Sequence, residues 1–269
     1  MTTLVVGATG ATGRLLVEQL LERGESVRAV VRSRAKLVER VGAHELLAIT
    51  EASLLDLSDV ELVRLVQGCR SVASCLGHPL SFKGIYGSPR RLVTDSVRRL
   101  CAAVKAASEP APTRFVLMNT AGNGNRDLRE PVSLGQRVVI GLLRALLPPH
   151  VDNEQAADFL RVVIGPRDPR IEWVAVRPDT LIDAGSITAY DVHPSPTQSA
   201  IFNPGKTSRI NVAHFMAELI SDDTVWTRWK GQMPVVYNRD SSLLMAHENI
   251  LLALAVQHQD SATTPPRHL

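Results

Sequence analysis

Short apolar runs typical of strands alternate with longer helical patterns through the first two thirds of the chain. Apolar residues that recur every three or four positions predict helices, whereas short runs of Val, Ile and Leu predict buried strands. Helices between successive strands act as crossovers, so the strands should lie parallel in an α/β, doubly wound sheet with helices on both faces. The predicted strands are 4–6, 27–31, 45–49, 71–76, 114–118 and 171–176, and the predicted helices include 35–41, 60–66 and 90–107.

The pattern changes after the sixth predicted strand. Residues 178–209 are rich in Pro, Ser and Thr and are expected to be irregular, on the substrate side of the molecule. A helix over 212–220, a strand over 233–237 and a last helix over 242–256 follow. We expect one domain over 1–258, with a small substrate-side lobe over about 178–240 and a disordered tail over 259–269.

Composition excludes several classes of protein. Of the 269 residues, 45% are hydrophobic and 21% charged, which is typical of a globular chain. The net charge is only +3 and no run of five Lys or Arg occurs, so no nucleic-acid partner is expected. No apolar stretch is long enough for a membrane span. Three cysteines without a CxxC motif, and no cleavable leader, favour the reducing cytoplasm.

A glycine-rich segment, GATGATG over residues 7–13, follows the first strand directly and opens the first helix. Glycine lets a pyrophosphate approach the backbone where a Cβ would collide, and the helix N-terminus offers N–H groups and a positive dipole end. The segment therefore predicts a dinucleotide site, although glycines also serve ordinary turns. The expected contacts are Gly7, Thr9, Gly10, Ala11, Thr12 and Gly13.

The end of the second strand bears on the choice of dinucleotide. An acidic residue there would accept hydrogen bonds from a ribose 2′-hydroxyl, as NAD sites require. This chain instead carries Arg32 and Ser33, a guanidinium and a hydroxyl suited to a 2′-phosphate. We expect NADP, the alternative being that these side chains only solvate a strand end.

Two further strand ends supply candidate contacts. Asp56-Leu57 follows the third strand and could receive the adenine; otherwise Asp56 caps the next helix, for which Ser58 is better placed. Cys75, Leu76 and Gly77 end the fourth strand, where a small-residue loop would pass under the ribose and pyrophosphate. Cys75 is expected to be a buried small side chain rather than a reactive thiol, because no base or metal ligand is suggested nearby.

Together these residues resemble the short-chain dehydrogenase/reductase superfamily, and most closely its atypical NmrA-like and flavin/biliverdin-reductase-like members. Further resembling segments are FVLMNTA over 115–121, WVAVRP over 173–178 and SRINVA over 208–213. The resemblance implies a Rossmann sheet with the nicotinamide at the carboxyl ends of the later strands. It also implies that Asn119, Thr120, Ala121 and Pro178 lie near that ring.

The chain departs from this superfamily at the catalytic Tyr-x-x-x-Lys pair. It has no Tyr between residues 86 and 190 and no Lys between residues 105 and 206. Aligning the following helix places His150 at the Tyr position and Glu154 at the Lys position, with Thr120 at the catalytic Ser or Thr. A histidine could donate the proton near neutral pH.

Other interpretations of this region stay open. Asp152 and Gln155 form a capping-box pattern that would start the helix after His150, leaving His150 an ordinary surface residue. His78 is a second candidate proton source. The apolar segment 138–147 could be a lid, a dimer surface or core packing. No residue spacing indicates a metal site.

Two functions fit these features. The first is an NADPH-dependent oxidoreductase that reduces a small carbonyl, quinone or flavin-like acceptor. Its expected partners are this small-molecule substrate and, in a homodimer, a second copy of the chain. The second is a non-catalytic NADP(H) sensor of the NmrA kind, which the missing Tyr and Lys favour. The glycine-rich segment is compatible with both.

Overall fold

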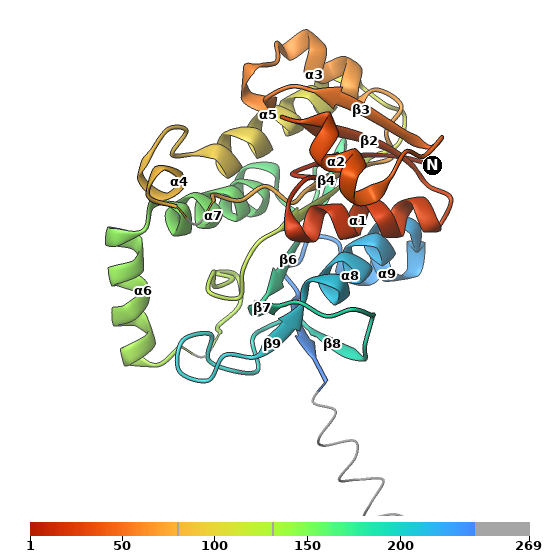
Figure 1. Cartoon of the computed structure of the whole chain (residues 1–269). Coiled ribbons are helices and arrows are strands. Elements are labelled where there is room, and N and C mark those ends of the chain that lie inside the picture. The colour runs from red at the N-terminus through yellow and green to blue at the C-terminus, as the bar shows by residue number, and fades with distance from the viewer. Residues whose placement is uncertain (80, 131, 240–269) are drawn as a thin grey trace, which may run out of the picture.

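The computed structural model describes residues 1–79, 81–130 and 132–239, and it is built around an eight-stranded sheet (Figure 1). Neighbouring strands are parallel except at one edge, where β8 runs antiparallel to β10. This strand order is that of the doubly wound Rossmann fold, so the predicted fold class is confirmed. Across the sheet the strands are β3 (Leu47–Glu51), β2 (Ser26–Val31), β1 (Thr2–Val6), β4 (Ser71–Ser74), β5 (Thr113–Met118), β6 (Ile171–Pro178), β10 (Val235–Asn238) and β8 (Tyr190–His193).

Helices cover both faces of the sheet. Their apolar sides form two clusters, because the crossovers alternate between the faces. One face carries α3 (Asp59–Val66), α5 (Leu92–Ala107), α7 (Pro148–Asp158) and the π-helical turn Phe159–Ile164 that extends α7. The other carries α1 (Ala11–Glu22), α2 (Arg34–Val41), α8 (Arg209–Ser221) and α9 (Asp223–Trp229).

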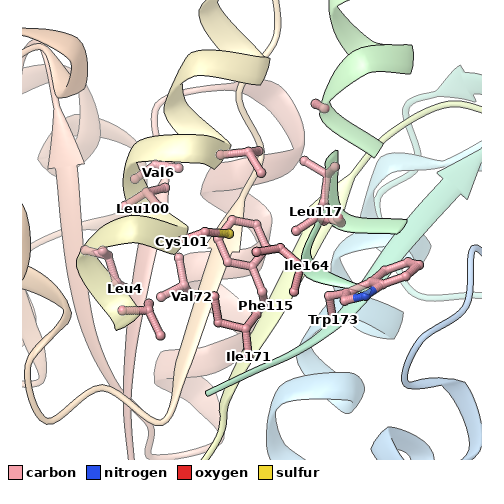
Figure 2. Packing of buried hydrophobic residues seen from close by; sticks show 14 of the residues in the cluster. Leu4, Val6, Val72, Leu100, Cys101, Phe115, Leu117, Ile164, Ile171 and Trp173 are labelled. Atoms are coloured by element: carbon pink, nitrogen blue, oxygen red, sulfur yellow. The ribbon is translucent and has the colours of Figure 1, made fainter. Parts of the chain in front are cut away.

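Successive strand residues alternate between the two clusters. Leu4 and Val6 lie with Phe115 and Leu100 in the cluster shown in Figure 2, whereas Val5 lies on the opposite face. Each large side chain that is fully buried in this way stabilises the fold by about 1.5–3 kcal/mol. The central strands are therefore a rigid support for the loops at their carboxyl ends.

The segment 178–209 is more ordered than its composition predicted. It contains β7 (Thr180–Ile182) and β9 (Lys206–Ser208), which pair in parallel, as well as β8. Each of these strands has only three or four residues and pairs with a segment distant in sequence, so no local periodicity marks it. The prediction of an irregular segment was wrong for these three strands and is confirmed for the residues between them. The predicted helix over 242–256 and the tail over 259–269 lie outside the described residues.

Two helices stand apart from the sheet on the side of α7 (Figure 1). These are α4 (Phe82–Tyr86) and α6 (Leu134–Leu146), and no residue of α6 is buried. Core packing is therefore excluded for the apolar segment 138–147. The N-cap residue of α6 is Ser133, whose hydroxyl accepts a hydrogen bond from the Gln136 N–H.

Candidate functional site

The glycine-rich segment joins β1 to α1 by a tight turn. Gly7 has φ +76°, and a Cβ there would lie 2.5 Å from the backbone of Cys75. A Cβ at Gly13 would lie 2.2 Å from the Gly7 carbonyl oxygen, so both positions require glycine for packing alone. Gly10 is different, because its nearest neighbour beyond the adjacent residues is the Gly7 oxygen at 3.1 Å and the space is otherwise open.

Gly10 is also the N-cap residue of α1, and it supplies no side chain to cap that helix. The first backbone N–H groups of α1 consequently lack the usual side-chain acceptor, and they lie beside the open space at Gly10. An anionic group such as a pyrophosphate could bind there at the positive end of the helix dipole.

A cleft of about 840 Å³ opens at this turn, at the carboxyl ends of β1, β2 and β4. Its volume falls within the range of sites for cofactors and other small molecules. The predicted contacts that line it are Gly7, Thr9, Gly10, Ala11, Thr12, Arg32, Asp56, Cys75, Leu76 and Gly77. Further lining residues that were not predicted as cofactor contacts include Ser53, Leu55, His78, Leu92, Met118 and Leu181.

Arg32 is exposed at the rim of this cleft and makes no ion pair with any described residue. Ser33 instead caps α2, with its hydroxyl accepting a hydrogen bond from the Lys36 N–H at 3.4 Å. Lys36 and Arg14 line an adjoining cavity of about 540 Å³. Arg40, Glu39 and Asp183 line the same cavity, so charges of both signs meet where the end of β2 lies near α1 and α2. Neither Arg14 nor Lys36 was predicted as a contact, because each lies on a helix and not at a strand end.

The two residues after β3 have different surroundings. Asp56 is exposed at the cleft, at the end of a 3₁₀ turn, while Leu57 packs against the core and does not line the cleft. Ser58 caps α3 in a capping box with Glu61, so Asp56 is not that cap. The backbone of Leu57 is held by Arg99, which donates to its carbonyl oxygen.

Cys75 forms part of the cleft wall under the glycine turn. Burial raises the pKa of its thiol to about 12, so the group stays protonated and a weak nucleophile at neutral pH. This agrees with the prediction of a small, unreactive side chain.

His78 is engaged by protein groups on both ring nitrogens. Its Nε2 lies 2.8 Å from the Asp152 carboxylate, and its Nδ1 lies 3.1 Å from the Gly84 carbonyl oxygen. The side chain is almost completely buried. With both nitrogens occupied by acceptors, His78 has no free position from which to donate a proton into the cleft, so the hypothesis of a proton source fails here.

Asp152 lies on α7 but caps a different helix. Its carboxylate accepts hydrogen bonds from the backbone N–H groups of Val93 and Thr94, and so caps α5 from a distant part of the chain. The capping-box interpretation, in which Asp152 starts α7, is wrong. The helix begins two residues before His150, at Pro148, a residue whose fixed φ suits the first helical position.

His150 and Glu154 therefore lie one turn apart on α7, with Nε2 and Oε1 3.5 Å apart. Arg144 of α6 donates two hydrogen bonds of 2.8 Å to the same carboxylate. Burial alone would raise the pKa of Glu154, but contact with His150 and Arg144 outweighs it and holds that pKa at about 2. Glu154 is ionised throughout the neutral range, while the His150 Nε2 is buried with no hydrogen-bond partner among the described residues.

Thr120 lies close to His150 at the carboxyl end of β5. A Cβ placed on Gly122 would be 3.7 Å from both the Thr120 hydroxyl oxygen and the His150 Cε1, so the two side chains flank that glycine. The Thr120 oxygen accepts a hydrogen bond from the Gly122 N–H at 3.3 Å. The fold thus brings Thr120, His150 and Glu154 into one cluster.

None of the residues expected near the nicotinamide lines the cleft, and neither do His150 and Glu154. The residues next to Thr120 instead hold the end of β5 against α7 and β6. The buried Asn119 amide donates to the Asn153 carbonyl oxygen on α7, and its oxygen accepts from the Thr120 N–H. Ala121 is buried, and its N–H donates to the carbonyl oxygen of Pro178, which ends β6.

Arg177, next to Pro178, is completely buried and fixes the loop after β5. It forms two hydrogen bonds with the Glu130 carboxylate, at 2.7 and 3.2 Å, and donates to the Asn123 carbonyl oxygen at 2.9 Å. Buried ion pairs persist only where further hydrogen bonds satisfy both partners, and the Asn125 N–H supplies one to Glu130. Arg177 thus holds the loop beside Thr120 in one shape.

No helix among residues 1–79, 81–130 and 132–239 is long and apolar enough to cross a membrane.

Comparisons with known proteins place this arrangement in a family. The sequence matches the NAD(P)H-binding family over residues 7–223. It is 32% identical over 126 residues to cinnamoyl-CoA reductase 2 of Medicago truncatula, a match that covers 45% of this chain and 35% of that protein. The chain thus spans about a third of the length of this curated relative.

Two solved structures share the fold at low identity. An oxidoreductase from Lactococcus lactis aligns with a TM-score of 0.63 and 17% identity, over 93% of this chain and 97% of that one. A short-chain dehydrogenase/reductase from Veillonella parvula, solved in complex with NADP, aligns with a TM-score of 0.63 and 14% identity, over 88% and 94%. Together with its glycine-rich turn and strand order, the family match shows that the chain belongs to the NAD(P)H-binding family, in agreement with its resemblance to atypical short-chain dehydrogenases/reductases.

Proposed function

We propose that the protein is an NADPH-dependent oxidoreductase that reduces a small carbonyl, quinone or flavin-like acceptor. The observation that carries this proposal is the cluster of Thr120, His150 and Glu154. Thr120 lies two residues after Met118, the residue of β5 that lines the cleft, and the other two lie on α7. Bound NADPH would supply the hydride. The remaining requirements, which are to orient the cofactor and deliver a proton, fall to this chain.

The open space at Gly10 and the N-terminus of α1 would receive the pyrophosphate, since the two neighbouring glycines are already filled by backbone. Arg32 supports a preference for NADP over NAD. Its guanidinium is exposed at the cleft without an ion-pair partner among the described residues, and no carboxylate follows β2 to bind a ribose hydroxyl.

His150 is the proposed proton donor. The nearest carboxylate to its buried Nε2 is that of Glu154, at 3.5 Å, and this carboxylate would stabilise the imidazolium form. Arg144 holds that carboxylate in place, so Glu154 is a positioning residue. The Thr120 hydroxyl flanks Gly122 together with the His150 ring, and it would bind the acceptor oxygen.

The test is NADPH oxidation with a panel of aldehydes, ketones, quinones and flavins, measured for the wild type and for His150→Ala. If His150 donates the proton, turnover of a carbonyl compound falls by about 100-fold or more, and NADPH affinity does not change. The rate of reduction of a quinone or flavin that takes its proton from solvent changes little. Equal rates for the two proteins with every carbonyl compound would contradict the role of His150.

A non-catalytic NADP(H) sensor is the second candidate. The observation that favours it is the absence of the Tyr and Lys on which the superfamily relies. A sensor would bind NADPH without oxidising it in the presence of any acceptor of the panel. The same measurement therefore separates the two functions.

A further inference from the structure

A second cavity, of about 250 Å³, lies between the loop after β5 and α6. Three arginines contribute to its wall: Arg126 from the loop, and Arg137 and Arg144 from α6. Glu130 is the acidic residue of this lining. So many guanidinium groups around a small cavity would repel one another unless carboxylates compensate them.

Two of the three arginines form ion pairs with carboxylates. Arg144 is held by Glu154, and Arg126 lies 3.0 Å from Asp158. Glu130 is already bound by Arg177, outside the cavity lining. This leaves Arg137.

Arg137 is exposed, and its guanidinium forms no ion pair or hydrogen bond with any residue in the described ranges. The cavity therefore carries one positive charge without a partner. Because guanidinium binds carboxylate through two parallel hydrogen bonds, this is a position at which an anionic ligand would be recognised.

The same cavity adjoins the reacting cluster. Gly122 forms part of its wall and is flanked by the Thr120 hydroxyl and the His150 ring. Arg144, also in the wall, binds the carboxylate beside His150. A ligand in the cavity would thus contact Arg137 and Gly122, and Gly122 is the residue that the His150 ring flanks. The volume is below that of sites for drug-sized ligands, so the ligand is small.

We propose that this cavity holds the acceptor, and that the acceptor is a small carbonyl compound whose carboxylate is bound by Arg137. The proposal rests on the function proposed above and names its substrate class. The carbonyl carbon takes the hydride of NADPH and the carbonyl oxygen takes a proton, which gives the hydroxy acid and NADP⁺. Arg137 does not touch the reacting atoms and acts as a specificity residue.

The experiment compares 4-formylbenzoate with its methyl ester, which keeps the aldehyde and removes the charge. With the wild type and NADPH, we expect kcat/KM for the acid to exceed that for the ester by about tenfold or more, the effect of a hydrogen bond to a charged group. Arg137→Gln should remove this preference, mainly by raising KM for the acid, and Arg137→Lys should restore part of it. Arg129→Gln is the matched control, because Arg129 is exposed on the same loop and does not line the cavity.

Binding separates the failure of this proposal from that of the proposed function. If NADPH binds but no acceptor is reduced, calorimetric titration of 4-formylbenzoate into the NADP⁺-loaded protein still tests the cavity. Binding that is lost in Arg137→Gln and kept in Arg129→Gln would support the site without the reaction. Three results would overturn the proposal. The first is an equal kcat/KM of the wild type for the acid and the ester, and the second is an equal fall of both values in Arg137→Gln. The third is that the acid does not bind measurably.

Discussion

The two ends of the proposed active site are built in different ways. The phosphate end consists of one continuous turn between β1 and α1, and its geometry depends on backbone and on glycines. The reacting end combines side chains from the loop after β5, from α6 and from α7, and a buried arginine of β6 holds that loop. The phosphate end can be recognised from seven consecutive residues. The reacting end is assembled only when the chain folds, so its chemistry can change while the phosphate end keeps its sequence.

The largest expected effect tests whether the reacting end depends on the buried Arg177. Changing Arg177→Met leaves the Glu130 carboxylate buried without its partner, which should lower the free energy of unfolding by about 3–5 kcal/mol. NADPH affinity should not change, because the phosphate end lies elsewhere. Urea denaturation and calorimetric titration measure the two effects. The double variant Arg177→Met/Glu130→Leu should recover part of the stability, and no recovery would show that the charge is not the cause.

The matching test at the phosphate end is Gly10→Val. The new side chain would fill the open space beside α1, so NADPH affinity should fall by at least about 100-fold, or about 2.7 kcal/mol. The fold should persist, because only the Gly7 oxygen is close to this position. Gly141→Ala on α6, where a Cβ meets nothing within 4 Å, is the control. Unchanged affinity in a folded Gly10→Val protein would remove the phosphate end from this turn.

A smaller effect is expected on stability at the reacting end, where the charge of Glu154 makes the stability depend on pH. The pKa of Glu154 in the folded protein, about 2, is below its ordinary value of 4.5, so ionised Glu154 stabilises the fold. That contribution is complete above pH 4.5 and is lost as the pH falls toward 2. Wild type should therefore exceed Glu154→Gln in stability by about 1 kcal/mol at pH 7, a screened value for a partly exposed pair. Denaturation at several pH values checks this, and a difference that does not depend on pH would contradict it.

The contrast between the two ends also explains which features could be predicted from sequence. The central strands, their helices and the turn at residues 7–13 follow from local periodicity and from glycine chemistry. The cap that Asp152 provides to α5 joins residues 58 and 59 positions apart, so the local pattern was assigned to the wrong helix. The spacing of His150 and Glu154 was recognised through family resemblance, since no pattern in this chain alone indicates it.

Other features depended on tertiary contacts that no window of sequence contains. The strands within 178–209 form because β10 and β7 offer them partners. Arg177 belonged to a recognisable motif, but its partner Glu130 lies 47 residues earlier. Arg137 directly precedes the apolar segment 138–147, and its unpaired charge becomes apparent only when the cavity wall is assembled.

The central claim is that the cleft binds NADPH in preference to NADH through Arg32. The most direct measurement is calorimetric titration of the wild type and of Arg32→Ala with both cofactors. We predict that the wild type binds NADPH more tightly, and that Arg32→Ala loses about 1.5–3 kcal/mol of NADPH affinity and little NADH affinity, because only the 2′-phosphate meets the guanidinium. Equal losses for the two cofactors, or a wild type that prefers NADH, would contradict the account.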